Sequence, residues 1–136
     1  MRRWRVVNPE DVEPVRLSQR TNFKLVDPTT VNSEHLTFGM VIVDPRGVCK
    51  PGHSHADQEE IFFCIRGEGV VILDGERVKI KPYDAVFIPA GVFHELENPN
   101  KTPLEVLWII SPPGWPFDKY PEWKKKALKG ESLESE

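Results

Sequence analysis

The chain has 136 residues, which is enough for one hydrophobic core and too few for two, so the sequence predicts a single domain. Its 18 basic and 21 acidic residues are mixed along the chain and give a formal charge of -3. No region of one sign exists to attract a polyanion or an anionic bilayer, which argues against nucleic acid and membranes as partners.

Short apolar segments between frequent turns make up most of the chain, which contains 9 glycines and 13 prolines. Segments of this length that are rich in Val, Ile and Phe are typical of β-strands. Leu36–Val43 is predicted to form a strand that ends in the turn Asp44–Gly47. Ile61–Ile65 is apolar without a break, which predicts a strand covered on both faces.

The next segment carries the pattern of a β-hairpin. Val70–Leu73 and Glu76–Ile80 flank Asp74-Gly75, a pair that tolerates the positive φ angles of a two-residue type I′ turn. Three further strands are predicted at Ala85–Ile88, Val92–Glu97 and Leu104–Ile110. Short strands at such close intervals predict an all-β sandwich or a closed barrel.

Helix is expected only near the two ends. Asn8–Asp11 has a capping residue, a proline at the first helical position and early acids, which favours a single helical turn. Pro121–Lys129, followed by Gly130, is predicted to form a short helix, and the acidic tail Glu131–Glu136 is expected to fray.

No apolar segment long enough for a signal-peptide core or a bilayer span is present. Without an export signal, Cys49 and Cys64 are expected to be reduced thiols rather than a disulfide. The expected location is therefore the cytoplasm.

Three of the four histidines lie in two short windows. His53 and His55 are two residues apart, so on a strand their side chains point to the same side. Glu60 is out of phase with them, so residues 56–59 must turn the chain before Glu60 opens the next strand and faces the same interior. In the second window, His94 stands where a strand leaves the bend that Pro89 and Gly91 create. Three imidazoles and one carboxylate suit a first-row transition metal ion, whereas calcium and magnesium prefer oxygen ligands.

These windows resemble the two conserved motifs of the cupin superfamily. The first motif is Gly, five residues, His-X-His, three or four residues, Glu, six residues, Gly, and it is matched by Gly47, His53, His55, Glu60 and Gly67. The second is Gly, five residues, Pro-X-Gly, two residues, His, three residues, Asn, and it is matched by Pro89, Gly91, His94 and Asn98. The opening glycine of the second motif is replaced by Tyr83, which alters a turn and leaves the histidine in place.

The resemblance implies a cupin barrel, that is, a jelly-roll or double-stranded β-helix with short terminal helical turns. It divides the chain into an N-terminal arm over residues 1–30 that packs on the barrel or on a partner subunit, the barrel over residues 31–112, and a C-terminal aromatic segment, short helix and frayed tail over residues 113–136. It also implies one divalent transition metal ion per chain, with iron or manganese favoured and zinc, nickel, cobalt or copper as alternatives. The implied ligands are His53, His55, Glu60 and His94. Cupins of this size are commonly homodimers, so a homodimer is expected.

Strand alternation predicts the residues around the metal. If Glu60 faces inward, Phe62 and Cys64 share its side, and Glu59 faces outward as a solvated charge. The same parity from His94 turns Leu96 and Asn98 inward. Among Leu104–Ile110, either Val106 and Trp108 or Leu107 and Ile109 face the barrel. The predicted substrate pocket comprises Phe62, Cys64, Leu96 and Trp108.

Other reactive side chains match no motif. Cys49 lies close to His53 and is expected in the core, although a place at the pocket rim is an alternative. Arg66 and Tyr83 are expected on the surface, and His35 in a loop. No general acid or base is identified from the sequence.

Three functions are compatible with this site. The first is a metal-dependent enzyme, most simply a dioxygenase, whose small organic substrate chelates the ion through oxygen. The second is an isomerase, epimerase or decarboxylase acting on a sugar or keto acid, which needs an additional titratable group near the ion. The third is a non-catalytic protein that binds a small molecule through the metal.

Overall fold

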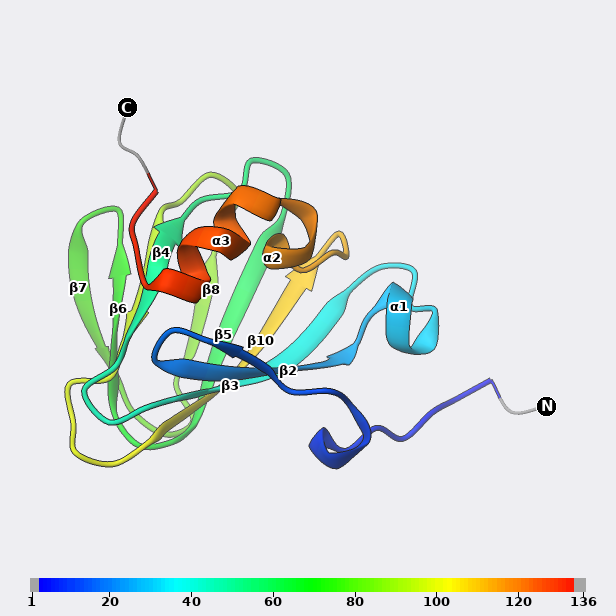
Figure 1. Ribbon diagram of the computed structural model, residues 1–136, viewed down its shortest axis with the longest axis horizontal. Coiled ribbons are helices and arrows are strands. Elements are labelled where there is room, and N and C mark those ends of the chain that lie inside the picture. Colours follow the sequence, from blue (N-terminus) through cyan, green and yellow to red (C-terminus); the bar gives the residue numbers. More distant parts are fainter. Residues whose placement is uncertain (1–2, 134–136) are drawn as a thin grey trace.

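Two antiparallel β-sheets face each other and enclose the hydrophobic core (Figure 1). This computed structural model describes residues 3–133. The larger sheet has the strand order β1-β2-β3-β10-β5-β8 and the smaller one β4-β9-β6-β7. The strands are β1 Val15–Leu17, β2 Arg20–Val26, β3 Thr37–Val43, β4 Val48–His53, β5 Glu59–Arg66, β6 Gly69–Leu73, β7 Glu76–Ile80, β8 Ala85–Ile88, β9 His94–Glu97 and β10 Leu104–Ser111. The predicted all-β class and cupin barrel are confirmed.

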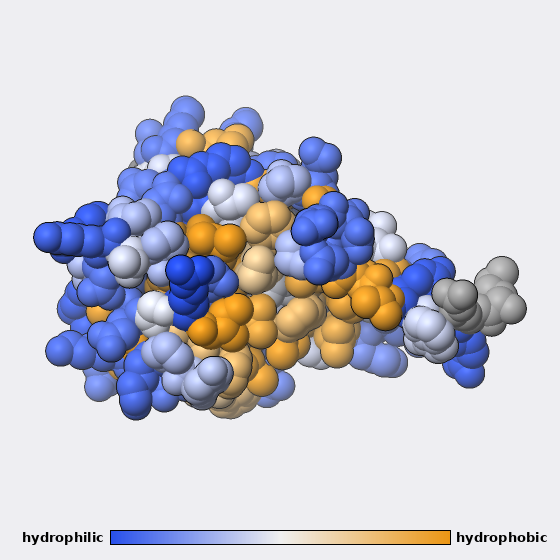
Figure 2. Space-filling model, turned by 90° about the horizontal axis from the view of Figure 1, so that it is seen from below, coloured by the Kyte–Doolittle hydropathy of each residue, from blue (hydrophilic) through white to orange (hydrophobic). Residues whose placement is uncertain are grey.

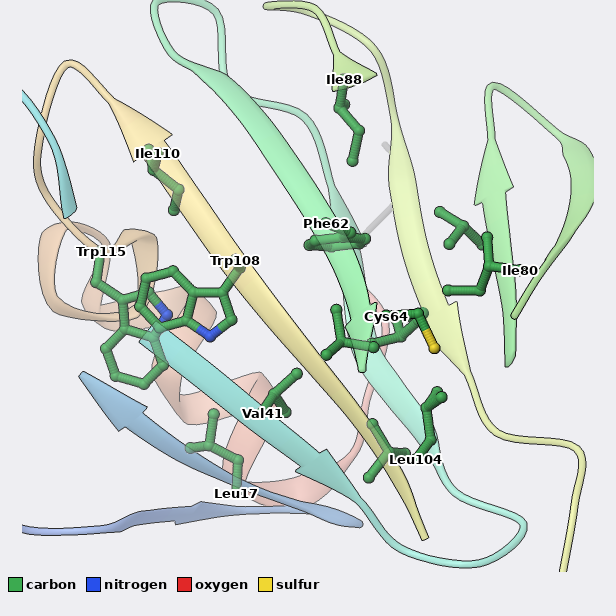
Figure 3. Close-up of a cluster of buried hydrophobic side chains, with 14 of the residues drawn as sticks. Leu17, Val41, Phe62, Cys64, Ile80, Ile88, Leu104, Trp108, Ile110 and Trp115 are labelled. Atoms are coloured by element: carbon green, nitrogen blue, oxygen red, sulfur yellow. The ribbon is translucent and has the colours of Figure 1, made fainter. Parts of the chain in front are cut away.

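The core lies between the two sheets because β3, β5 and β10 of the larger sheet bury alternate side chains. In β10 the buried set includes Val106 and Trp108, so the first of the two predicted phases is correct. In β5 the buried set is Glu60, Phe62 and Cys64, as the alternation predicts, while Glu59 is exposed. Figure 3 shows Trp108 lying over Trp115 at one end of this core, with Cys64 among aliphatic side chains at the other.

The expectation that Ile61–Ile65 is covered on both faces is wrong. Ile61 is 36% exposed, and Phe63 and Ile65 are only half-buried. The reason is that the outer face of the larger sheet is not covered by a second layer within the described residues 3–133. Unbroken apolar sequence in this strand therefore reflects an apolar outer surface rather than a fully enclosed strand.

The predicted hairpin is present. β6 and β7 pair from Gly69↔Ile80 to Leu73↔Glu76, and Asp74 and Gly75 have φ angles of 48° and 86°. Both central residues thus occupy the left-handed region that a type I′ turn requires.

The helical segments are short and lie near the termini, except for α1. The 3₁₀ turn η1, Pro9–Asp11, is closed by a capping box from Asn8, as predicted. Helix α3, Pro121–Lys129, ends at Gly130, also as predicted. Two short helices, α1 (Pro28–Val31) and α2 (Pro116–Lys119), were not predicted from the sequence. The predicted fray concerns residues 131–136, of which 134–136 lie outside the described residues.

The C-terminal helices lie over one end of the barrel (Figure 1). Their attachment is specific: Ser18 N–H donates to Ala127 O at 2.9 Å, and Lys24 Nζ lies 2.6 Å from Asp118 Oδ2. The same region of the barrel carries the histidines, so α2 and α3 cover the candidate site. Within residues 3–133, no helix has the length and apolar character needed to cross a bilayer.

Candidate metal centre

Four side chains converge at one point inside the barrel. Their ligand atoms all lie within 4.8 Å of one another, and the residues are His53, His55, Glu60 and His94. Strand pairing brings the two sequence windows together, because β4 and β9 pair with His53 opposite His94. Gly91 N–H also donates to His55 O at 2.8 Å, which ties the second window to the first. The separation of about forty residues between the windows is thus closed by backbone hydrogen bonds.

Backbone carbonyls set the tautomer of all three histidines. Nδ1 lies 3.1 Å from Pro51 O in His53, 3.2 Å from Gln58 O in His55 and 3.0 Å from Val92 O in His94. A carbonyl oxygen only accepts hydrogen bonds, so Nδ1 carries the proton in each ring. The Nε2 lone pairs are then left to face the common centre. Metal-binding histidines are oriented in this way in proteins.

Glu60 is the negatively charged side chain of this buried centre. Glu60 Oε1 lies 3.2 Å from His55 Nε2 and 3.1 Å from His94 Nε2. Burial by itself would raise the pKa of Glu60, but the contacts with His55 and His94 outweigh it and lower this pKa to about 2. Glu60 is therefore a carboxylate at neutral pH.

The pKa values of His53 and His94 are shifted in opposite directions. Burial, together with the neighbouring His94, lowers the pKa of His53 to about 3. Burial also acts to lower the pKa of His94, but the Glu60 carboxylate beside it raises that pKa above its ordinary value. His94 is the ring of this pair that holds a proton more readily when no cation is present.

A buried nitrogen without a hydrogen bond indicates that the centre suits a cation. His94 Nε2 is buried and is not aligned for a hydrogen bond with any group in residues 3–133, even though Glu60 Oε1 is close. Three inward lone pairs and a carboxylate repel one another unless a positive charge lies between them. The residues thus fit a divalent transition metal ion bound by three nitrogens and one oxygen, a donor set that leaves room for further ligands.

An apolar cavity of about 70 Å³ opens beside His53, Glu60 and His94. Phe62, Leu96 and Trp108, three of the four predicted pocket residues, line it. Cys64 does not: it is fully buried in the core, where its thiol donates to Gly67 O at 3.3 Å. Burial raises the pKa of Cys64, as expected of a structural thiol.

Aromatic side chains from the C-terminal segment complete the cavity wall. Trp115 stacks on Trp108 at 6.0 Å with an interplanar angle of 8°, and the Phe117 ring lies 5.6 Å from that of His53. The Trp123 ring also contacts His53, and the two ring centroids are 4.8 Å apart. The Phe117 and Trp123 rings thus cover the His53 imidazole.

Gln58 holds the segment that carries these aromatics. Its Nε2 donates to Pro112 O at 2.8 Å and to Gly114 O at 3.0 Å, and Gln58 is almost completely buried. Gln58 lies between His55 and Glu60 in the sequence. The same turn therefore positions metal-site side chains and the wall above them.

Sequence reasoning missed the polar side chains of the cavity. Arg20 and Asn22 on β2 and Glu95 on β9 line it. Cys49 lines it too, which agrees with the alternative of a place beside the pocket. In β2 the polar residues point inward while Phe23 is on the outer side, the reverse of the usual pattern. The only signal in the sequence was the alternation of side chains along β2, and this alternation does not show which set of side chains faces inward. Burial raises the pKa of Cys49 to about 12, so this thiol is uncharged.

The other reactive side chains lie away from the centre, as expected. Arg66, Tyr83 and His35 are exposed. Tyr83, which replaces a motif glycine, has a φ of 77°. It thus keeps the left-handed conformation for which glycine is usually required.

Comparison with known proteins agrees with this geometry. A family model described as "Cupin domain" matches residues 39–110, a segment that contains all four metal-site residues. A Thermotoga maritima protein named "Oxalate-binding protein" is 30% identical over 112 residues, which cover 77% of this chain and 92% of the relative. An uncharacterized protein of Methanocaldococcus jannaschii is 36% identical over 61 residues, and the match spans about half, 49%, of that relative.

Solved structures show the same fold. The crystal structure of a predicted oxalate decarboxylase from Thermotoga maritima matches with a TM-score of 0.70 and 27% identity, covering 79% of this chain and 98% of the other. A sugar phosphate isomerase of the cupin superfamily from Silicibacter pomeroyi matches with a TM-score of 0.69 and 18% identity, covering 79% and 75%. At 18% identity, the similarity to the Silicibacter pomeroyi protein shows a shared fold and nothing more.

Proposed function

Because the chain belongs to the cupin family and gathers three histidines and one glutamate around one point, we propose that it is a metal-dependent enzyme. Its substrate is a small organic molecule that chelates the metal through oxygen. The observation that carries this proposal is the buried Nε2 of His94, which is left without a hydrogen bond at the centre of a polar cluster that opens into an apolar cavity. Iron(II) or manganese is the favoured ion.

The chain's own residues orient the reactants and exclude water. The three histidines, held by backbone carbonyls, and Glu60 present a fixed donor set. Phe62, Trp108 and Phe117 provide apolar surfaces against which a substrate lies. Once bound, a transition metal ion supplies Lewis acidity and, if it is redox-active, a position for dioxygen.

Dioxygenase-type chemistry is the first candidate reaction. It is supported by the aromatic and apolar wall formed by Phe62, Leu96, Trp108, Trp115 and Phe117. Such a wall limits the access of water and of protons to a reacting centre. Oxygen insertion needs no acid and base pair from the protein.

Isomerisation, epimerisation or decarboxylation of a sugar or keto acid is the second candidate. It is supported by Glu95, a buried carboxylate that lines the same cavity. Its Oε2 lies 3.3 Å from Lys50 Nζ and accepts from Gly52 N–H at 3.1 Å. A carboxylate in this position is a group that can move a proton.

The test begins with metal analysis of the purified protein, followed by assays of the iron-loaded and manganese-loaded forms. Small enols, diketones, keto acids and sugars are supplied with and without oxygen. Oxygen uptake that His53→Ala abolishes, and that His35→Ala at the exposed loop histidine does not, supports the first candidate. Turnover under strict anaerobiosis selects the second. Tight binding of a small molecule without any turnover selects a non-catalytic binding protein, and absence of bound metal refutes all three.

A homodimer is our proposed assembly. The outer face of the larger sheet supports it, because residues paired across the strands there are apolar, including the row Phe38, Ile109, Ile61 and Phe87. Figure 2 shows hydrophobic side chains gathered near the centre of one face of the molecule, surrounded by hydrophilic ones. Light scattering on the wild type and on Ile109→Glu tests this: a dimer that becomes a monomer supports it, and a monomeric wild type refutes it.

We also propose a cytoplasmic location. Cys49 and Cys64 are both free thiols, which is the usual state in a reducing compartment.

A further inference from the structure

One positive charge in the cavity, that of Arg20, forms no ion pair within the part of the chain that the structure describes. Arg20 on β2 is 2% exposed and lines the cavity beside the metal-site residues. Within residues 3–133, no carboxylate forms an ion pair with it. A buried guanidinium without a carboxylate partner is energetically unfavourable, since desolvation of the charge is not offset by a full opposite charge.

The hydrogen bonds of Arg20 leave part of its guanidinium unused. Nη1 donates to Ser18 O at 3.0 Å and to Lys50 O at 2.8 Å. Within residues 3–133 the side chain makes no other hydrogen bond, so Nε and Nη2 keep their donors. Burial lowers the pKa of Arg20, but a guanidinium remains protonated at neutral pH. The group is a cation with free donors.

Asn22 lies beside Arg20 on β2, and within residues 3–133 its side-chain amide also keeps unused donors. The two residues are separated by one position on β2, so their side chains project to the same, inner side. Asn22 lines the cavity and is 5% exposed, and its side-chain amide makes no hydrogen bond within residues 3–133. Two polar residues at inward positions of a strand, both with free donors, indicate a site for a ligand oxygen rather than a structural network.

The charge balance of the cavity also favours an anion. Among the lining residues Arg20 carries a positive charge, and Glu60 and Glu95 carry negative charges. Lys50 forms an ion pair with Glu95 from outside the lining. The two carboxylates exceed the guanidinium by one charge, so a divalent ion at the metal site turns this excess into a net positive charge in the cavity. Glu95 does not neutralise Arg20 by contact, because its carboxylate is engaged with Lys50 Nζ and Gly52 N–H.

The position of Arg20 separates it from the metal centre. Its Cζ lies 5.5 Å from the centroid of the Phe117 ring, and that centroid lies 5.6 Å from the centroid of His53. Arg20 and His53 thus contact the same aromatic ring. A ligand that reaches both needs a polar group at each end and a short apolar part between them.

On this basis we propose that Arg20 and Asn22 form a carboxylate-binding subsite, and that the substrate is a small organic acid whose carboxylate lies there while other oxygens face the metal centre. The inference rests on the proposed metal-dependent function and adds the substrate class to it. A carboxylate is favoured over a phosphate because one guanidinium and one amide match a single negative charge in two-pronged geometry. Doubly charged phosphates are usually held by several cations or by a helix N-terminus.

The experiment compares two ligands that differ in one charge. Succinate and its monoamide, succinamate, are titrated calorimetrically into manganese-loaded protein whose metal content has been measured. The wild type is expected to bind succinate at least tenfold more tightly than succinamate. In Arg20→Gln this ratio is expected to fall to within twofold, and Arg20→Lys is expected to restore part of it. Arg66→Gln removes an equally charged but exposed group from β5 and is expected to leave the ratio unchanged.

A second variant guards against misfolding, because Arg20 also bonds to backbone carbonyls. Asn22→Asp keeps the size of the side chain and supplies Arg20 with an internal carboxylate, so succinate binding is expected to weaken at least tenfold. Circular dichroism and metal content report folding and metal binding separately. A succinate preference that persists in folded, metal-loaded Arg20→Gln and Asn22→Asp overturns the proposal. Tighter, Arg20-dependent binding of inorganic phosphate also overturns it. Wild-type protein that binds no metal instead refutes the proposed function.

Discussion

Replacing Glu60 with glutamine is the sharpest test of the metal centre, because it removes one negative charge without changing the size of the side chain. Glu60 is 6% exposed, and its Oε1 lies within 3.2 Å of two histidine Nε2 atoms. Its neighbour Glu59 is exposed on the opposite face of β5 and provides a matched control. We expect Glu60→Gln to weaken metal binding about a hundredfold, and Glu59→Gln to leave it unchanged.

The magnitude follows from the linkage between binding and folding. At a metal concentration one hundred times the dissociation constant, the metal stabilises the wild type by about 2.7 kcal/mol. For a chain of 136 residues, about 3–4 °C of Tm corresponds to 1 kcal/mol, so the metal raises Tm by about 10 °C. At the same concentration, a variant that binds a hundredfold more weakly gains about 0.4 kcal/mol, or between 1 and 2 °C.

The assay is differential scanning calorimetry with and without metal, with bound metal quantified in parallel. The comparison uses the metal-induced increment in Tm within each variant, which is independent of any change in the metal-free protein. Equal increments for Glu60→Gln and the wild type would refute the assignment of Glu60 as a ligand. An increment lost in Glu59→Gln would show that the charge of the strand, rather than the buried donor, controls binding.

Three further outcomes are expected. Because the pKa of His94 is raised, protons compete with the metal for this ring as the pH falls, so the dissociation constant measured by titration is expected to be larger at pH 6 than at pH 8, and a pH-independent value would contradict this. Gln58→Leu leaves the carbonyls of Pro112 and Gly114 without their donor, so chemical denaturation is expected to show a loss of about 2–3 kcal/mol; a loss below about 0.5 kcal/mol would show that Gln58 does not hold the segment. At Tyr83, whose φ is 77°, glycine is expected to raise the free energy of unfolding by about 0.5 kcal/mol and valine to lower it by about 1 kcal/mol, and the opposite order would exclude backbone strain at this position.

The metal-site residues were predictable because motif spacing and strand alternation are local properties. The period of two in β5 separates Glu60 from Glu59, and the Asp74-Gly75 pair defines the hairpin turn. The same reasoning failed at Ile61, since a run of apolar residues does not reveal whether its outer side meets another layer, another chain or solvent.

Strand β2 shows why the polar part of the cavity was not predictable. Its alternation of Arg20 and Asn22 with Thr21 and Phe23 suits either phase, and ordinary amphipathic reasoning places Phe23 inside. Pairing with β3 decides the opposite phase, with Phe23 beside Met40 on the outer face. A position that breaks the usual pattern is often a functional one, which is why Arg20 became interpretable only within the folded chain.

Residue type and spacing within a few positions were enough to identify the fold family, the four candidate metal ligands and the inward face of β5. The tertiary structure decided the contents of the cavity. Pairing of β4 with β9 places His53 opposite His94, the phase of β2 turns Arg20 inward, and the bonds of Gln58 hold the segment that carries Phe117 over the histidines. These contacts join residues far apart along the chain, and their geometry is set by strand register and packing, which no local pattern specifies.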